Sequence, residues 1–173
     1  MNNNNKILAL FGKSGAGKDT IAKELCKNTN EFHQLISCTT RPKRDYEING
    51  KDYFFISNDK YKELLNNNQF LEVTTFNNWN YGTLKQANNI NKINVGVFNI
   101  QGIYNMLSNP LLINYRILPV YIYASDKIRL NRLFNREKYP NYKEICRRFL
   151  TDEEDFKDIP FYYTLYNNDN NEG

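Results

Sequence analysis

Short apolar runs alternate with stretches of helical periodicity along the whole of the 173-residue chain. The runs that predict buried strands are 7–11, 34–38, 53–56, 70–76, 95–100, 117–124 and 162–166. Between them, apolar residues three or four apart predict helices from 19, over 57–65, from 84, over 102–107, around 128–134 and over 142–156. Strands that alternate with helices predict an α/β protein, with a parallel sheet flanked by helices and right-handed crossovers.

The composition indicates one folded domain and a small anionic ligand. Hydrophobic residues make up 40% of the chain, which is long enough to bury a substantial core. The net charge of +4 suits an anionic ligand but is too weak to indicate a nucleic-acid groove. The longest apolar runs, 7–11 and 117–124, are far shorter than the roughly 20 residues that span a bilayer. Neither nucleic acid nor membrane is therefore an expected partner.

The cysteines indicate a reducing compartment. Cys26, Cys38 and Cys146 are an odd number without metal-ligand spacing. The apolar run near the N-terminus is too short for the core of a signal peptide. We therefore expect a reduced, cytoplasmic protein.

The strongest chemical signal is the segment 12–18, which lies between a predicted strand and a predicted helix. Its residues fit the P-loop pattern and are all candidates for the ATP site: Gly12, Lys13, Ser14, Gly15, Ala16, Gly17 and Lys18. The glycines allow backbone N–H groups to converge on phosphate oxygens, and Lys18 adds a full positive charge at the β- and γ-phosphates. The segment predicts a P-loop NTPase fold that binds ATP.

The next residue departs from the P-loop pattern. Asp19 stands where a Ser or Thr hydroxyl normally coordinates Mg²⁺, and Thr20 follows it. A carboxylate binds Mg²⁺ directly or orients its waters, so Asp19 is a candidate metal ligand and Mg²⁺ is the expected cofactor. Alternatively, Asp19 caps the helix, where a negative charge near the N-terminus is favourable. Both residues are ATP-site candidates.

A basic polar loop follows the second predicted strand. Arg41 and Arg44 lie three residues apart on it, and Tyr53 follows. Two guanidinium groups and a phenol suit a dianionic phosphate, because bidentate charged hydrogen bonds fix its orientation. Taken alone, the loop is also compatible with a solvated basic surface.

Together with the P-loop, five further motifs resemble the guanylate kinase family in order and spacing. They are Ser37-x-x-Thr40-Arg41-x-x-Arg44, Gly50-Lys51-Asp52-Tyr53-Phe54-Phe55, Phe70-Leu71-Glu72, Tyr81-Gly82-Thr83 and Ile100-Gln101-Gly102. The resemblance covers about residues 6–169 and implies a P-loop NTPase fold with an insertion that binds the nucleoside monophosphate (NMP) and a helical lid. The implied parts of this single domain, 1–173, are a core of about 6–38, 84–131 and 149–169, an NMP-binding insertion of about 39–83 and a lid of about 132–148.

The resemblance also implies roles for individual residues. The acceptor phosphate is held by Arg41, Arg44, Tyr53 and Tyr81, and guanine by Ser37, Glu72 and Thr83. Arginines of the lid act on the transferring phosphoryl group, which implies Arg132, Arg136 and Arg148, and Asn168 lies near the donor adenine. The glutamate makes chemical sense, since one carboxylate accepts from both N1–H and the 2-amino group of guanine, whereas adenine turns a lone pair toward it.

The chain departs from this family in two places. Where the family has Asp-x-Asp before Gln-Gly, this chain has Val97-Phe98-Asn99. Asn99 keeps an acceptor oxygen without the charge, so it remains a candidate at the GMP site. The chain also ends at Gly173 without the C-terminal helix that is usual in the family.

These patterns predict an enzyme that transfers the γ-phosphoryl group of ATP to GMP or dGMP, as a monomer or weak dimer. In-line transfer between phosphates needs positioning and charge neutralisation rather than a general base. Two alternatives stay open: a kinase of the same architecture with another acceptor, and a non-catalytic module that binds phosphorylated peptides. The intact P-loop and the lid arginines favour a kinase.

Overall fold

The computed structural model describes residues 5–136, 138–159 and 163–168, and these ranges form two sheets. The strands of the larger sheet are β1 (Lys6–Phe11), β2 (Phe32–Gln34), β7 (Ile93–Val97), β8 (Arg116–Tyr123) and β9 (Thr164–Tyr166). Their order is β2-β7-β1-β8-β9, and every neighbouring pair is parallel. This confirms the expected α/β class. The predicted strand 162–166 has its first residue, Tyr162, outside the described ranges.

The smaller sheet is formed by strands between residues 38 and 84. Its strands are β3 (Cys38–Thr39), β4 (Phe54–Phe55), β5 (Phe70–Phe76) and β6 (Trp79–Leu84), in the order β4-β3-β6-β5. The prediction of one strand over 34–38 is wrong, because the chain passes here from one sheet to the other. Leu35 packs in the core of the larger sheet, whereas Cys38 packs with Tyr61 and Phe70 in a separate cluster.

The helices are α1 (Lys18–Asn28), α2 (Asn58–Asn66), α3 (Ile100–Leu107), α4 (Asp126–Asn135) and α5 (Tyr142–Asp155). The expected helix from Leu84 is only a 3₁₀ turn, Lys85–Ala87. The backbone of Lys85 is still bonded to Gln69, and the buried Asn94 side chain accepts the backbone N–H of Asn89. These hydrogen bonds fix the segment in turns, so it does not continue as an α-helix. No helix in the described ranges has the length and apolar character needed to cross a bilayer.

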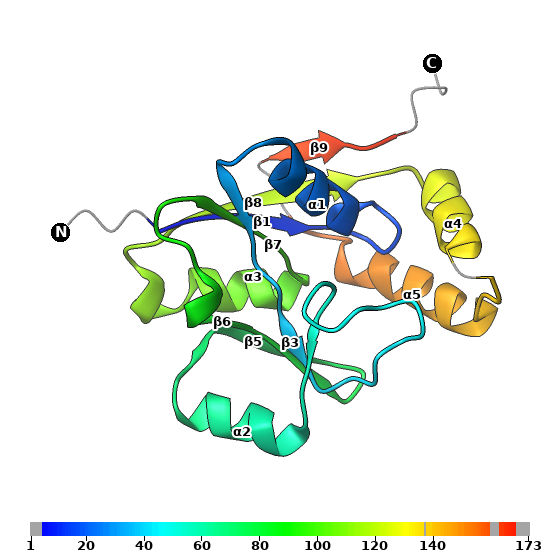
Figure 1. The fold of residues 1–173 in the computed structure, drawn as a ribbon. Helices are drawn as coiled ribbons and strands as arrows, with labels where there is room; N and C mark the ends of the chain where they lie inside the picture. The colour runs from blue at the N-terminus through cyan, green and yellow to red at the C-terminus, as the bar shows by residue number, and fades with distance from the viewer. Residues whose placement is uncertain (1–4, 137, 160–162, 169–173) are drawn as a thin grey trace.

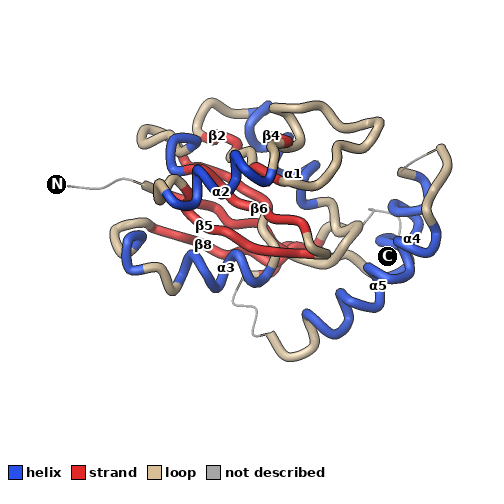
Figure 2. The backbone as a smooth tube through the Cα atoms, turned by 90° about the horizontal axis from the view of Figure 1, so that it is seen from below, coloured by secondary structure: helices blue, strands red, loops and turns tan. Residues whose placement is uncertain are grey.

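The elements are arranged in layers (Figure 1). Helix α1 covers one face of the larger sheet, and α3 lies on the other face, between it and the smaller sheet. Seen from below, α2 lies across the outer side of the smaller sheet, and α4 and α5 lie together at one end of the molecule (Figure 2). Since the strands of the larger sheet are parallel, the loops after β1, β7 and β8 meet at the edge where α4 and α5 lie, which is where such folds bind ligands.

Candidate active site

The phosphate loop, residues 12–18, joins β1 to α1. Gly17 is the N-cap of α1 with φ 92°, in the left-handed region, and a Cβ there would collide with the side chain of Asn167. The ammonium group of Lys18 lies back across the loop and donates to the carbonyls of Gly12, at 2.7 Å, and Lys13, at 3.1 Å. Burial lowers the pKa of Lys18. The loop therefore holds a cation at its centre, as the P-loop pattern predicts.

Two further side chains touch the carbonyl side of this loop. Arg132 on α4 lies 3.5 Å from the Gly15 oxygen and 3.4 Å from the Ala16 oxygen, and also donates to the Asn167 carbonyl at 3.0 Å. Asn167 donates to Ala16 O at 2.8 Å. Sequence reasoning missed Asn167, although its position directly after the last strand places it at this edge of the sheet. The residue it selected, Asn168, accepts instead from the Ser125 backbone N–H beside α4.

The other two lid candidates, Arg136 and Arg148, make their closest described contacts with other side chains. Arg136, directly after α4, has its guanidinium carbon 5.3 Å from the ring centre of Tyr46. Arg148 donates to Glu144 at 2.6 Å, one turn earlier in α5. Hydrogen bonds from Arg147 and Arg148 hold the pKa of Glu144 at about 2. Of the three predicted lid arginines, Arg132 reaches the carbonyls of the phosphate loop, and burial and, to a smaller extent, the charge of Arg136 lower the pKa of Lys18. Glu137, within the predicted lid, lies outside the described ranges.

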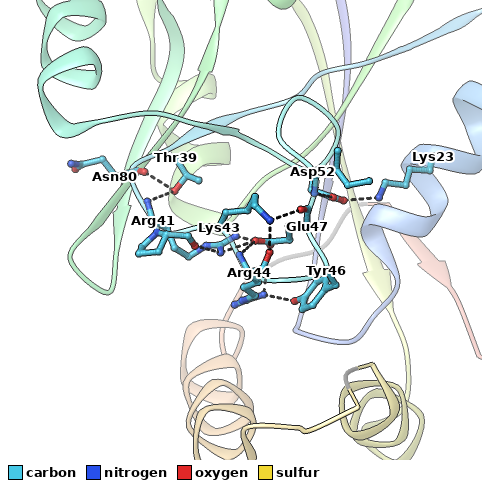
Figure 3. A network of polar contacts seen from close by, with 11 residues as sticks. Lys23, Thr39, Arg41, Lys43, Arg44, Tyr46, Glu47, Asp52 and Asn80 are labelled. Atoms are coloured by element: carbon cyan, nitrogen blue, oxygen red, sulfur yellow. Dashed lines mark hydrogen bonds and ion pairs between the residues drawn. The ribbon is translucent and has the colours of Figure 1, made fainter.

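The acceptor loop, residues 40–53, contains a buried ion pair (Figure 3). Arg41 binds both carboxylate oxygens of Glu47, at 2.7 and 2.9 Å, and Glu47 also accepts the Arg44 backbone N–H at 2.8 Å. Although burial raises it, these bonds keep the pKa of Glu47 below its ordinary value. Sequence reasoning missed Glu47, whose one signal is its position three residues after Arg44. The side chain of Arg44 reaches the hydroxyl of Tyr46 at 2.8 Å.

The two tyrosines predicted at the acceptor phosphate lie together beside Arg41. The guanidinium carbon of Arg41 is 5.4 Å from the ring centre of Tyr53, and the rings of Tyr53 and Tyr81 meet edge to face at 6.0 Å. Burial raises the pKa of Tyr53, and the carboxylate of Asp19 raises it further. Asp19 on α1 therefore lies near Tyr53, and Lys23 of α1 pairs with Asp52 of the acceptor loop at 2.8 Å (Figure 3).

The residues predicted to recognise guanine form a chain of hydrogen bonds on the smaller sheet. Thr83 donates to the carboxylate of Glu72 at 2.9 Å, and its hydroxyl lies 2.8 Å from that of Ser37. The side chain of Glu72 is almost completely buried. Burial raises the pKa of Glu72 to about 7, even though the hydroxyl and backbone N–H of Thr83 act in the opposite direction. The result is a carboxylate poised to change charge near neutral pH.

Asn99 lies close to this carboxylate. It is the N-cap of α3, where its side-chain oxygen accepts the Gly102 backbone N–H at 2.8 Å and its amide donates to Thr74 at 3.1 Å. A Cβ at Gly102 would lie 3.0 Å from a Glu72 oxygen and 3.2 Å from the Asn99 oxygen. The asparagine in place of the family's aspartate is therefore next to the guanine-site candidates, with its oxygen engaged in capping the helix.

Asp19 has the chemistry of a magnesium ligand. It lies exposed on the first turn of α1, and within the described ranges its carboxylate makes no hydrogen bond or ion pair. The described residues contain no group of three acidic, histidine or cysteine side chains that would hold a metal by themselves. One free carboxylate beside a phosphate loop fits Mg²⁺, which commonly binds through one or two carboxylates together with substrate phosphates.

This geometry defines a class, the P-loop nucleotide-binding proteins. The family model for guanylate kinase matches residues 4–173. A guanylate kinase of Wigglesworthia glossinidia brevipalpis is 38% identical over 177 residues, which cover 96% of this chain and 82% of that protein. The chain belongs to the guanylate kinase family, as its motifs predict.

Other relatives agree over part or all of the chain. A guanylate kinase of Mesomycoplasma hyopneumoniae is 50% identical over 82 residues, 46% of this chain and 41% of that protein. The crystal structure of guanylate kinase from Anaplasma phagocytophilum matches with a TM-score of 0.67 at 23% identity, covering 95% of this chain and 78% of that one. This structural match supports the P-loop NTPase fold.

Proposed function

We propose that this chain transfers the γ-phosphoryl group of ATP to GMP and dGMP, as expected for an enzyme of the guanylate kinase family. The observation that carries the choice of acceptor is the buried carboxylate of Glu72, bonded to Thr83. A buried acceptor of this kind suits the two adjacent N–H donors of guanine and penalises bases that present a lone pair. The phosphate loop with Lys18 favours catalysis over a module that only binds phosphorylated peptides.

Catalysis in this proposal is positioning and charge neutralisation. Lys18 and Arg132 neutralise the transferring phosphoryl group, with Arg136 and Arg148 joining them on the lid. When bound with ATP, Mg²⁺ supplies further neutralisation, and Asp19 would hold it. The acceptor phosphate is already an anion, so the chain needs no general base.

Arg41 is prepared to bind the acceptor phosphate. Of its five N–H groups, three are used by Glu47 and the Pro42 carbonyl. The remaining two, on Nε and Nη2, lie on one side of the guanidinium and form a second fork. Glu47 therefore orients Arg41 without consuming the donors that a phosphate needs. Arg44, Tyr53 and Tyr81 complete this phosphate site.

The division into parts is also a proposal. The insertion, 39–83, contains the acceptor residues other than Ser37 and Asn99, and the lid, 132–148, contains Arg132, Arg136 and Arg148; closing both over the nucleotides would exclude water that hydrolyses ATP. A cytoplasmic location and a monomeric or weakly dimeric state stay predictions.

The acceptor is identified by measuring ADP release with GMP, dGMP, AMP, CMP, UMP and dTMP in turn. Turnover with GMP and dGMP, and a preference of at least about a hundredfold over AMP, is expected because a polar mismatch at Glu72 is costly. A preference for another monophosphate would support the alternative that the chain is a kinase with a different acceptor. Failure with all six would support the binding module.

Replacing Asp19 by alanine is expected to raise the Mg²⁺ concentration for half-maximal activity by about tenfold or more. The reason is that the variant loses a negative oxygen ligand. Titration of activity with Mg²⁺ at saturating ATP measures the effect. Asp59→Ala is the matched control, because Asp59 is also acidic in the first turn of a helix, α2, but lies away from the phosphate loop. Equal Mg²⁺ dependence in the two variants would assign Asp19 to helix stabilisation alone.

A further inference from the structure

Arg129 is a buried cation with no role in the function proposed so far. It lies on α4 with only 1% of its surface exposed, and it is the largest of the fully buried side chains in the described ranges. Its guanidinium lies 4.6 Å from the ring centre of Phe149 on α5. Buried arginines are rare and need full pairing, so the partners of this one indicate what it does.

One partner is the phosphate loop itself. Nε of Arg129 donates to the carbonyl of Ser14 at 3.0 Å, and Nη2 donates to Asp152 of α5 at 3.1 Å. Asp152 in turn accepts the backbone N–H of Ser14 at 2.6 Å and lies 3.4 Å from its hydroxyl. Arg129 and Asp152 therefore bind both backbone polar groups of one loop residue and each other.

A second pair extends this contact. Glu153 lies 3.3 Å from Nη1 of Arg129 and binds Lys13 of the loop at 2.6 Å. Asp126 of α4 also binds Nη1 of Arg129, at 2.8 Å, so the group has two cations, Lys13 and Arg129, and three carboxylates. The group therefore adds no positive charge that would attract a phosphate, and its effect on the loop is one of geometry.

The backbone of α4 supports the loop directly. Gly15 has φ 81°, and a Cβ there would lie 2.7 Å from the Arg129 carbonyl oxygen. Arg132 is three residues further along α4 and therefore on the same face, where it reaches the loop carbonyls. The contacts that fix Arg129 against the loop therefore also fix the position of Arg132.

We propose that Arg129 is a positioning residue for ATP: paired with Asp152, it clamps the phosphate loop to α4 and α5 and holds the loop and Arg132 in the arrangement that phosphates require. It touches no substrate. The proposal rests on the proposed function only in taking ATP as the nucleotide of this loop.

The test separates positioning from stability. Arg129→Met alone leaves Asp152 buried without its partner, which destabilises the fold. The double variant Arg129→Met/Asp152→Leu removes both charges, and apolar replacement of a buried pair is often tolerated. Glu153 and Asp126, the other carboxylates on Arg129, are sufficiently exposed to remain charged without it. Arg116→Met, at an exposed position on β8, is the matched control.

The readouts are the thermal unfolding midpoint, the Kd of a fluorescent ATP analogue and the KM for GMP. In the double variant, we expect the Kd for the ATP analogue to rise by about tenfold or more, as for the loss of a charged hydrogen bond, with the KM for GMP within about twofold. The control is expected to bind the analogue as the parent does. Wild-type affinity in a folded double variant would overturn the proposal.

A second variant covers the case in which the double variant does not fold. Arg129→Lys keeps the charge but has no planar fork to bind Ser14 and Asp152 together, so it is expected to fold and to bind the analogue more weakly. Parent-like affinity in Arg129→Lys would count against the clamp. The Kd of the analogue is measured without turnover. A parent protein that binds the analogue but does not phosphorylate GMP would therefore refute the proposed function, while the effect of the Arg129 variants on the Kd could still be measured.

Discussion

Replacing Lys18 by methionine is expected to lower kcat by about a thousandfold, the upper range for removing one preorganised donor from a developing charge. The ammonium group of Lys18 lies at the centre of the phosphate loop on two loop carbonyls. Those carbonyls satisfy it in the empty loop, and phosphate oxygens are the stronger acceptors when ATP is bound. Steady-state rates of ADP release at saturating ATP and GMP measure the loss.

Although Lys18→Met is expected to lower the rate, it is not expected to lower the stability of the protein. Burial lowers the pKa of Lys18, which means that its charge is costly in the empty protein. Methionine removes that cost, so the thermal midpoint should stay equal or rise. Lys27→Met, near the exposed end of the same helix, is the control and should retain full activity. A Lys18→Met variant with more than about a tenth of the parent rate would show that other cations neutralise the phosphates.

The phosphate loop was predictable because its determinants are contiguous. Glycine spacing, the apolar run before it and the helical periodicity after it all lie within residues 7–25, and the structure places β1, the loop and α1 there. The same is true of the helix predicted over 57–65, which begins where the Ser57 hydroxyl accepts the Lys60 backbone N–H at the start of α2. Local hydrogen bonding and periodicity decide such features, and both can be read along the chain.

The clamp on the loop was not predictable from spacing. Arg129 lies beside the apolar residues of α4, and its partner Asp152 lies on another helix. Helical periodicity states which residues share a face, but not that an arginine on that face is buried against a carboxylate of α5. The pairing exists only once α4 and α5 are packed against the loop.

Arg148 shows the same limit at a residue that a motif did select. Its position in the sequence suggests a phosphate contact, and in the structure it pairs with Glu144 four residues earlier. Spacing identifies both partners, since residues four apart meet on a helix. Spacing does not show whether Arg148 binds the nearby carboxylate or a phosphate that another part of the fold holds.

Replacing Glu72 by glutamine is expected to lower kcat/KM for GMP by about a thousandfold. The reason is that the glutamine amide places an N–H donor where the site must accept the two donors of guanine. Thr83 donates to one oxygen of this carboxylate, and the lone pairs that remain on the two oxygens are the acceptors for the two donors of guanine. The preference for GMP over AMP should narrow correspondingly. Glu63→Gln, on an exposed position of α2 in the same insertion, is the matched control and should leave both values unchanged. An unaltered preference in Glu72→Gln would place guanine recognition elsewhere.

The pH dependence gives the same residue a second, independent test. Because burial raises the pKa of Glu72 to about 7, the carboxyl group is protonated below that pH and no longer accepts from guanine. The value of kcat/KM for GMP is therefore expected to fall by about tenfold for each pH unit below 7. The phosphate of GMP titrates near pH 6 and contributes equally in every variant. The part of the profile that disappears in Glu72→Gln is thus the part that belongs to this carboxylate.

The sign for stability is the reverse of the sign for activity. The pKa of Glu72 is higher in the folded protein than its ordinary value of 4.5, so the folded state binds more protons between 4.5 and about 7. Without GMP, the contribution of Glu72 to the free energy of unfolding is fully present below pH 4.5 and is lost as the pH rises to about 7. Unfolding in urea at pH 5 and pH 8 should show this loss in the parent and a smaller one in Glu72→Gln. Acid is thus expected to stabilise the protein without GMP and to weaken the binding of GMP, because the buried carboxylate must be charged to accept from guanine.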